Sequence, residues 1–160
     1  MKSLAWGRRL PVPPWLYGRL SRWHHLSFLR SRETMRLLDD IYAGAEDRAA
    51  IAALRHLIDG ELGYRLYQAV EKVKVALSHD ERASLQFRDG PVDLSCEVTR
   101  REFEGWIAPE LAAIDGAVEQ LLAQTGVAPE AIDAVFLTGG TSMVPAVRRR
   151  FAARFGGGKL

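Results

Sequence analysis

The chain has 160 residues, of which 48% are hydrophobic and 26% charged, and its formal net charge is +2. These values are typical of a globular protein with one core, and they exclude fibrous and extensively disordered classes. No apolar run approaches the roughly 20 residues that cross a bilayer, and the N-terminus lacks the apolar stretch of a signal peptide. We therefore expect no membrane partner. A single cysteine, Cys96, rules out an internal disulfide and suits a reducing cytosol, so we expect a cytoplasmic protein.

Residues 1–18 contain several prolines and predict an irregular lead-in. A helix is expected from Leu20 to Leu38. His24 and His25, which are adjacent residues of this predicted helix, do not predict a metal site. Adjacent helical residues point about 100° apart, and no cysteine or carboxylate completes a set of metal ligands. Asp47 to Ser78 then predicts a long helix, with a bend or break near Gly60 and Gly63 because glycine weakens helices.

A β-hairpin is predicted after this helix. Ala83–Arg88 and Val92–Val98 alternate in hydrophobicity, and Asp89-Gly90 between them is a turn signal. Because Cys96 alternates with Leu94 and Val98, we expect it to be a buried strand residue.

The hairpin is followed by a second helical region. Thr99 with Glu102 three residues later forms a capping-box signature, and the helix that it opens is expected to end at Gly126. Arg148-Arg149-Arg150 is the densest basic spot near the C-terminus. No aromatic residues interleave with it, so a nucleic-acid partner is not favoured.

The C-terminal segment Val135-Phe-Leu-Thr-Gly-Gly-Thr-Ser-Met-Val-Pro145 is the most informative motif. Ala134–Leu137 predicts a short buried strand, Gly139-Gly140 a tight turn, and Val144–Phe155 a helix whose first turn tolerates Pro145. This order is the layout in which α/β proteins bind ligands at the carboxyl edge of a sheet. A purely structural turn is the alternative interpretation.

One face of the predicted long helix carries polar side chains. At about 100° per residue, Glu71, Lys74, Val75 and Ser78 share one arc, opposite the core positions Leu62, Leu66, Val70, Val73 and Leu77. A carboxylate, an amine and a hydroxyl along one helix face can form hydrogen bonds with ribose hydroxyls and with the edge of a base. An ordinary solvated face with a Glu–Lys pair is the alternative.

Together these motifs resemble the ATPase domain of the DnaK-type 70 kDa heat-shock proteins, in the sugar-kinase/actin superfamily. The family pattern is Glu-x-x-Lys-x-x-Leu-Ser, a hairpin, Thr-Arg-x-x-Phe-Glu, and a strand ending in Gly-Gly-(Ser/Thr)-(Ser/Thr)-x-x-Pro. Between Leu57 and Leu160 the chain has the corresponding segments, in this order: Glu71–Ser78, Thr99–Glu104 and Gly139–Pro145. The N-terminal part resembles the YegD-like bacterial branch.

The resemblance implies an α/β fold: a lobe II fragment of an actin-like (ribonuclease H-like) ATPase, with long helices, a β-hairpin subdomain and one core strand-turn-helix. The implied segments are an irregular and helical part at 1–45, a helical subdomain with the hairpin at 46–132, and a partial core unit at 133–160. The adenosine half of ATP or ADP is expected on six residues: Glu71, Lys74, Ser78, Gly139, Gly140 and Met143.

The family's phosphate loops, Asp-Leu-Gly-Thr and Asp-x-Gly-Gly-Gly-Thr, do not occur in the sequence. We therefore expect a truncated chain without catalytic or metal-binding residues. The resemblance implies that Mg²⁺, client proteins and the rest of the ATPase domain are partners in the parent family. Val75 and Met143 stand where better-known members have arginines that sandwich adenine. The alternative function is a free-standing protein-interaction module with a tryptophan-rich N-terminus and no nucleotide.

Overall fold

The structure is a computed structural model that describes residues 2–5, 8–20 and 26–160. The chain divides into two compact units: Met1–Lys72 with Ser84–Cys96, and Val73–Ala83 with Glu97–Leu160. Helices dominate both units, and each sheet in the described ranges is a two-stranded antiparallel pair. None of the described helices is long and apolar enough to cross a membrane. The predicted division at residues 45 and 132 stays a prediction.

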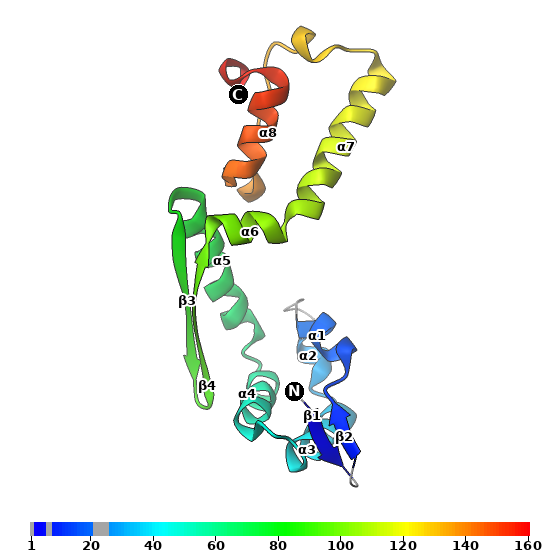
Figure 1. The fold of residues 1–160 in the computed structure, drawn as a ribbon, viewed down its shortest axis with the longest axis vertical. Helices are drawn as coiled ribbons and strands as arrows, with labels where there is room; N and C mark the ends of the chain where they lie inside the picture. Colours follow the sequence, from blue (N-terminus) through cyan, green and yellow to red (C-terminus); the bar gives the residue numbers. More distant parts are fainter. Residues whose placement is uncertain (1, 6–7, 21–25) are drawn as a thin grey trace. The chain divides into compact units, whose positions relative to one another are not determined.

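The first unit begins with a hairpin of β1 (Lys2–Ala5) and β2 (Arg8–Pro11), in which Lys2 pairs with Pro11 and Ala5 with Arg8 (Figure 1). The expected irregular lead-in is therefore wrong. The prolines are compatible with a strand and a helix here because each lies at the end of an element. Pro11 is the last residue of β2, and Pro14 is the first residue of α1 (Pro14–Leu20), where a missing N–H is harmless.

Three further helices follow: α2 (Leu26–Leu29), α3 (Arg32–Ala43) and α4 (Arg48–Asp59). The single helix expected from Leu20 to Leu38 is wrong, because the Ser31 side chain accepts a hydrogen bond from Thr34 N at 3.1 Å and starts α3 there. His24 and His25 lie outside the described residues.

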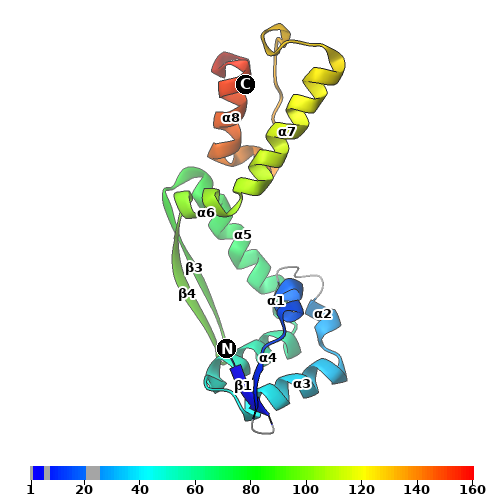
Figure 2. The ribbon, with the colours of Figure 1, turned by 45° about the vertical axis from the view of Figure 1, so that its right-hand side comes forward.

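The predicted break in the long helix is confirmed. Asp47 caps α4, which ends at Asp59, and α5 (Gly63–His79) begins after Gly60. The hairpin is confirmed as well, as β3 (Arg82–Asp89) and β4 (Val92–Thr99), with Gly90 at φ +51° in the turn. Figure 2 shows the two strands running side by side along their length.

The core of the first unit gathers apolar side chains from its N-terminal helices and from the hairpin tip. Its buried members are Val12, Leu16, Leu29, Leu38, Ile41, Ile51, Leu57, Ile58, Leu62, Phe87 and Val92. Cys96, by contrast, is exposed, so the expectation of a buried cysteine is wrong. The burial along β4 shows why: Val92 and Val98 near its ends are covered, whereas residues 93–97 between them are exposed.

The second unit contains α6 (Arg100–Trp106), α7 (Ala108–Thr125) and α8 (Pro145–Phe155). The single helix expected from Thr99 to Gly126 is thus divided in two. The break falls at Ile107 because Pro109 occupies the first turn of α7, where proline is tolerated; inside a continuous helix it would clash with the preceding turn. Gly126 ends α7 at φ +66°, as predicted.

Helices α7 and α8 lie side by side and run in the same direction, with an extended return segment between them (Figures 1 and 2). Arg150 pairs with Asp115 across the two helices, and Arg154 pairs with Glu119 at 2.7 Å. The return segment passes through the 3₁₀ turn η2 (Pro129–Ala131) before α8, and the 3₁₀ turn η4 (Gly157–Lys159) follows α8.

The buried strand expected at Ala134–Leu137 is wrong for this chain. These residues are extended but form no strand, and the Phe136 side chain is 90% exposed. Val135 N donates a single backbone hydrogen bond of 2.8 Å to Lys159 O. A strand requires a neighbouring ladder, and the described part of the chain supplies none beside this segment.

Candidate functional site

The polar face predicted on α5 exists as a helix face. Glu71, Lys74 and Ser78 follow one another at spacings of three and four residues. Lys74 is exposed, and Glu71 and Ser78 are partly buried, while Val73 and Leu77 on the opposite side belong to the core. Ser78 Oγ donates to Lys74 O at 3.4 Å, which leaves the hydroxyl oxygen available as an acceptor.

The Gly-Gly turn is built around a left-handed glycine. Gly139 has φ +82°, a region that other residues rarely adopt, and it leads into the 3₁₀ turn η3 (Gly140–Met143). The buried Ser142 holds this turn closed, since both its Oγ (2.7 Å) and its backbone N (3.1 Å) donate to Gly139 O. A Cβ at Gly139 or Gly140 would meet nothing within 4 Å, so this backbone is open to a ligand.

Helix α6 begins with the predicted capping box. Glu102 N donates to Thr99 Oγ1 at 3.2 Å, and Thr99 N donates to Glu102 Oε2 at 2.9 Å. Hydrogen bonds from the Thr99 side chain and then from its backbone lower the pKa of Glu102, because they favour the carboxylate. The first residue of this helix is thereby held in place.

Arg100 ties α6 to the end of α5. Its Nε donates to Leu77 O at 2.8 Å, and its backbone N donates to Glu81 O at 2.8 Å. Sequence reasoning places Arg100 in a family motif without giving it this contact. The available signal is its position directly after the cap residue Thr99, at which the hairpin ends.

The same short helix also supports the Gly-Gly turn. Phe103 of α6 and Ile107 after it pack against a small core in which Val144, Ala146 and Val147 from the start of α8 are buried with Leu111. Helix α6 therefore contacts the last turn of α5 at one end and the residues that follow η3 at the other. The polar face of α5 and the Gly-Gly turn are thus both next to segments that α6 contacts.

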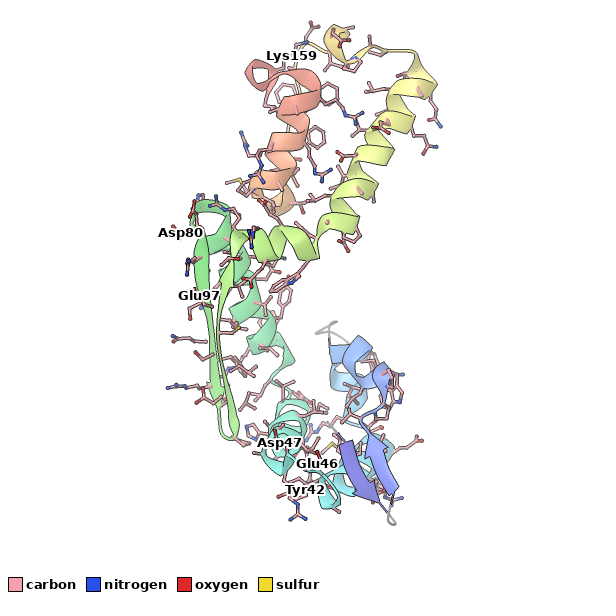
Figure 3. The ribbon with its side chains drawn as sticks, in the orientation of Figure 1. Tyr42, Glu46, Asp47, Asp80, Glu97 and Lys159 are labelled. Atoms are coloured by element: carbon pink, nitrogen blue, oxygen red, sulfur yellow. The ribbon has the colours of Figure 1, made fainter. Side chains whose placement is uncertain are left out.

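Two hollows lie on α6, and neither contains the predicted residues. One of about 520 Å³ is lined by charged and polar residues of the capping region: Glu81, Arg82, Thr99, Arg100, Arg101, Glu102 and Glu104. Another of about 500 Å³ lies where α6 and α7 face α8. Arg82 in the first hollow pairs with Glu97 at 2.9 Å across the hairpin (Glu97 is labelled in Figure 3).

The two positions that depart from the family pattern are accessible. Val75 on α5 is 61% exposed, and Met143 at the end of η3 is 50% exposed. Both can offer apolar contact to a ring but no guanidinium. Within residues 2–5, 8–20 and 26–160, no cluster of three or more His, Cys, Asp or Glu side chains could hold a metal ion.

Several proteins are similar to the chain. Heat shock protein hsp88 of Neurospora crassa is 36% identical over 94 residues, which cover 58% of this chain and 13% of that protein. Chaperone protein DnaK of Thermus thermophilus is 40% identical over 93 residues, 53% of this chain and 15% of that protein. A heat shock protein homolog of Eremothecium gossypii is 36% identical over 93 residues, with coverage of 57% and 13%.

The chain thus spans about one seventh of the length of these relatives. The similarity includes α5, the β3–β4 hairpin, α6 to α8 and the Gly-Gly turn, because the model of the Hsp70 protein family matches residues 56–159. With almost two thirds of its residues matched to this model, the chain belongs to the Hsp70 protein family.

Proposed function

We propose that the chain supplies the adenosine-facing part of lobe II in an Hsp70-type ATPase domain. Its ligand is the nucleoside half of ATP or ADP, and its binding residues are Glu71, Lys74, Ser78, Gly139, Gly140 and Met143. The observation that supports this is the shared attachment to α6: Arg100 bonds the last turn of α5, and Phe103 packs beside the start of α8. The end of α5 and the start of α8 therefore both contact this one short helix.

The chemistry of these groups suits a nucleoside. A carboxylate accepts hydrogen bonds from ribose hydroxyls, an ammonium donates to ring or hydroxyl acceptors, and the open glycine backbone permits close approach of a ring. Val75 and Met143 contribute apolar contact to the base. In the parent protein, the other lobe closes over the ligand and excludes water.

Hydrolysis is not part of this proposal for the chain alone. Phosphoryl transfer requires a phosphate cradle, Mg²⁺ held by carboxylates and a positioned water, and the two phosphate loops of the family are absent from the sequence. Chaperone activity, Mg²⁺ binding and client proteins belong to the complete ATPase and its partner domains.

The experiment compares two proteins. One is the 160-residue chain, and the other is a chimera in which this chain replaces the matching part of Thermus thermophilus DnaK. We expect the chimera to bind labelled adenine nucleotide and the chain alone to release no phosphate above background. A correctly folded chimera that binds no nucleotide, or turnover by the isolated chain, contradicts the proposal.

A further inference from the structure

The positive charge of the chain is concentrated at its N-terminus. Residues 1–36 contain eight arginines and lysines and one glutamate, a net charge of +7, whereas residues 37–160, with 14 basic and 19 acidic residues, carry −5. This basic region lies outside residues 56–159, which the Hsp70 family model matches. Because clustered positive charge attracts polyanions, the region is a candidate for a second binding surface.

The three helices of the basic region share one core in the first compact unit (Figure 1). Each of them buries a leucine there: Leu16 of α1, Leu29 of α2 and Leu38 of α3. Arg19, Arg32 and Arg36 are exposed, and none of them forms an ion pair within the described ranges, whereas Arg30 pairs with Glu61 at 2.9 Å. Arg32 and Arg36 are one turn apart on the same side of α3. Three guanidinium groups are thus available to an external anion.

Exposed aromatic rings accompany these cations. Trp15 of α1 is 44% exposed, and the guanidinium carbon of Arg19 lies 5.2 Å from the centroid of its ring. Phe28 of α2 is 71% exposed, two residues before Arg30. A ring beside a guanidinium group offers both a stacking partner for a base and a donor for a phosphate.

The isolated rings favour a nucleic acid over an anionic membrane. A helix that binds a membrane surface needs a continuous apolar face. Among the described side chains of α1 and α2, the apolar Leu16 and Leu29 are buried, and the large apolar groups at the surface are the single rings of Trp15 and Phe28. A base stacks on one ring alone, provided that it is not already paired and stacked in a duplex.

We infer that the basic region binds single-stranded nucleic acid, with Trp15 stacking on a base and Arg19, Arg32 and Arg36 binding phosphates. The electrostatic part of this binding does not depend on sequence, and stacking on a ring tolerates any base. The inference goes beyond the proposed function, because none of these four residues belongs to the adenosine site.

The first test measures binding of a fluorescein-labelled oligothymidylate to the 160-residue chain by fluorescence anisotropy at several salt concentrations. Arg32→Gln with Arg36→Gln should reduce the slope of log K against log salt by about 1.4, since each phosphate contact on a single strand contributes about 0.7. The matched control, Arg101→Gln with Arg148→Gln, removes the same charge from exposed arginines outside the basic region and should leave the slope unchanged. Equal slopes for the two double variants overturn the inference.

The second test addresses stacking. Trp15→Leu should weaken oligothymidylate binding about fivefold or more without changing the salt slope, and Trp15→Phe, which keeps a ring, should retain most of the affinity. The control Trp106→Leu removes an exposed tryptophan of α6 and should change nothing. An affinity that Trp15→Leu leaves unchanged overturns the inference.

Two further probes identify the partner. Vesicles of phosphatidylcholine with phosphatidylserine, and polyglutamate, should each bind more weakly than the oligothymidylate at the same salt concentration, because neither offers bases to stack. Equal or tighter binding of either probe, or no binding of the oligothymidylate, overturns the inference. The oligothymidylate contains no adenine, so these results leave the proposed adenosine site standing, and failure of adenosine binding leaves this inference standing.

Discussion

Arg100 Nε donates a hydrogen bond of 2.8 Å to the backbone carbonyl oxygen of Leu77. This contact joins residues 23 positions apart, across the whole β3–β4 hairpin. It satisfies a carbonyl in the last turn of α5, which has no partner within the helix, and it places a cation where the helix dipole is negative. The side chain therefore connects α5 and α6 directly.

Replacing Arg100 by Ala should lower the free energy of unfolding by about 1.5–3 kcal/mol, because a charge-assisted hydrogen bond is lost. Urea denaturation measures this change. Arg101→Ala on the exposed side of the same turn is the control and should change stability by less than about 0.5 kcal/mol. Equal effects of the two substitutions would contradict the role of the Leu77 contact.

The capping box should make stability depend on pH. The pKa of Glu102 is lowered from 4.5 by its bonds to Thr99, so its contribution to stability is present above the unfolded pKa and is lost as pH falls through the lower folded value. Thr99→Ala should cost about 1 kcal/mol at pH 7 and less at about pH 3. Thermal unfolding at both pH values, with Thr125→Ala as control, measures this; a cost that stays constant with pH contradicts it.

Gly90 and Gly105 should respond in opposite directions to substitution by alanine. Gly90 has φ +51°, and a Cβ there would lie 2.9 Å from His56 Nε2, the atom that is 2.7 Å from Asp89 Oδ1. Gly90→Ala should destabilise by more than about 1 kcal/mol. Gly105 lies within α6 with nothing near its Cβ, so Gly105→Ala should stabilise by about 0.5–1 kcal/mol. Denaturation midpoints that shift in the same direction for both variants would refute this contrast.

The stability of this hairpin tip should also depend on the ionisation of Asp89. Its hydrogen bonds to His56 and then to Arg65 lower its pKa from 3.8, so the tip is stabilised above that value and loosens as pH falls through the lower folded pKa. NMR titration of the Asp89 carboxyl measures the pKa directly. Arg65→Gln should raise it, and an unchanged value would show that the ion pair does not form.

The proposed adenosine site should bind its ligand more tightly when Val75 and Met143 are replaced by the two arginines that the chain lacks there. Val75 and Met143 are exposed, so Val75→Arg with Met143→Arg costs little packing. In the DnaK chimera the double substitution should tighten adenosine binding by about 1–2 kcal/mol through stacking and cation–π attraction. Glu71→Ala or Lys74→Ala should weaken it by about 1.5–3 kcal/mol. Calorimetric titration that finds neither change would remove these residues from the site.

Local chemistry allowed much of the fold to be predicted from sequence. The capping box at Thr99, the glycine turn at Gly90, the end of α7 at Gly126 and the start of α8 at Pro145 each depend on backbone preferences within a few residues. The polar face of α5 follows from helical periodicity alone. These features therefore do not depend on tertiary contacts and can be predicted from the local sequence.

Tertiary structure decided what lies against these elements. Alternation predicted burial for Cys96, and an apolar run predicted a buried strand at Ala134–Leu137, yet Cys96 and Phe136 are exposed, because burial depends on whether another element covers the segment. The Arg100–Leu77 bond and the packing of Phe103 beside Val144 join residues distant in sequence, so no local pattern indicates them. The sequence alone determined the polar face of α5 and the Gly-Gly turn, whereas only long-range packing decided that α6 contacts both motifs, because these contacts join residues distant in the chain.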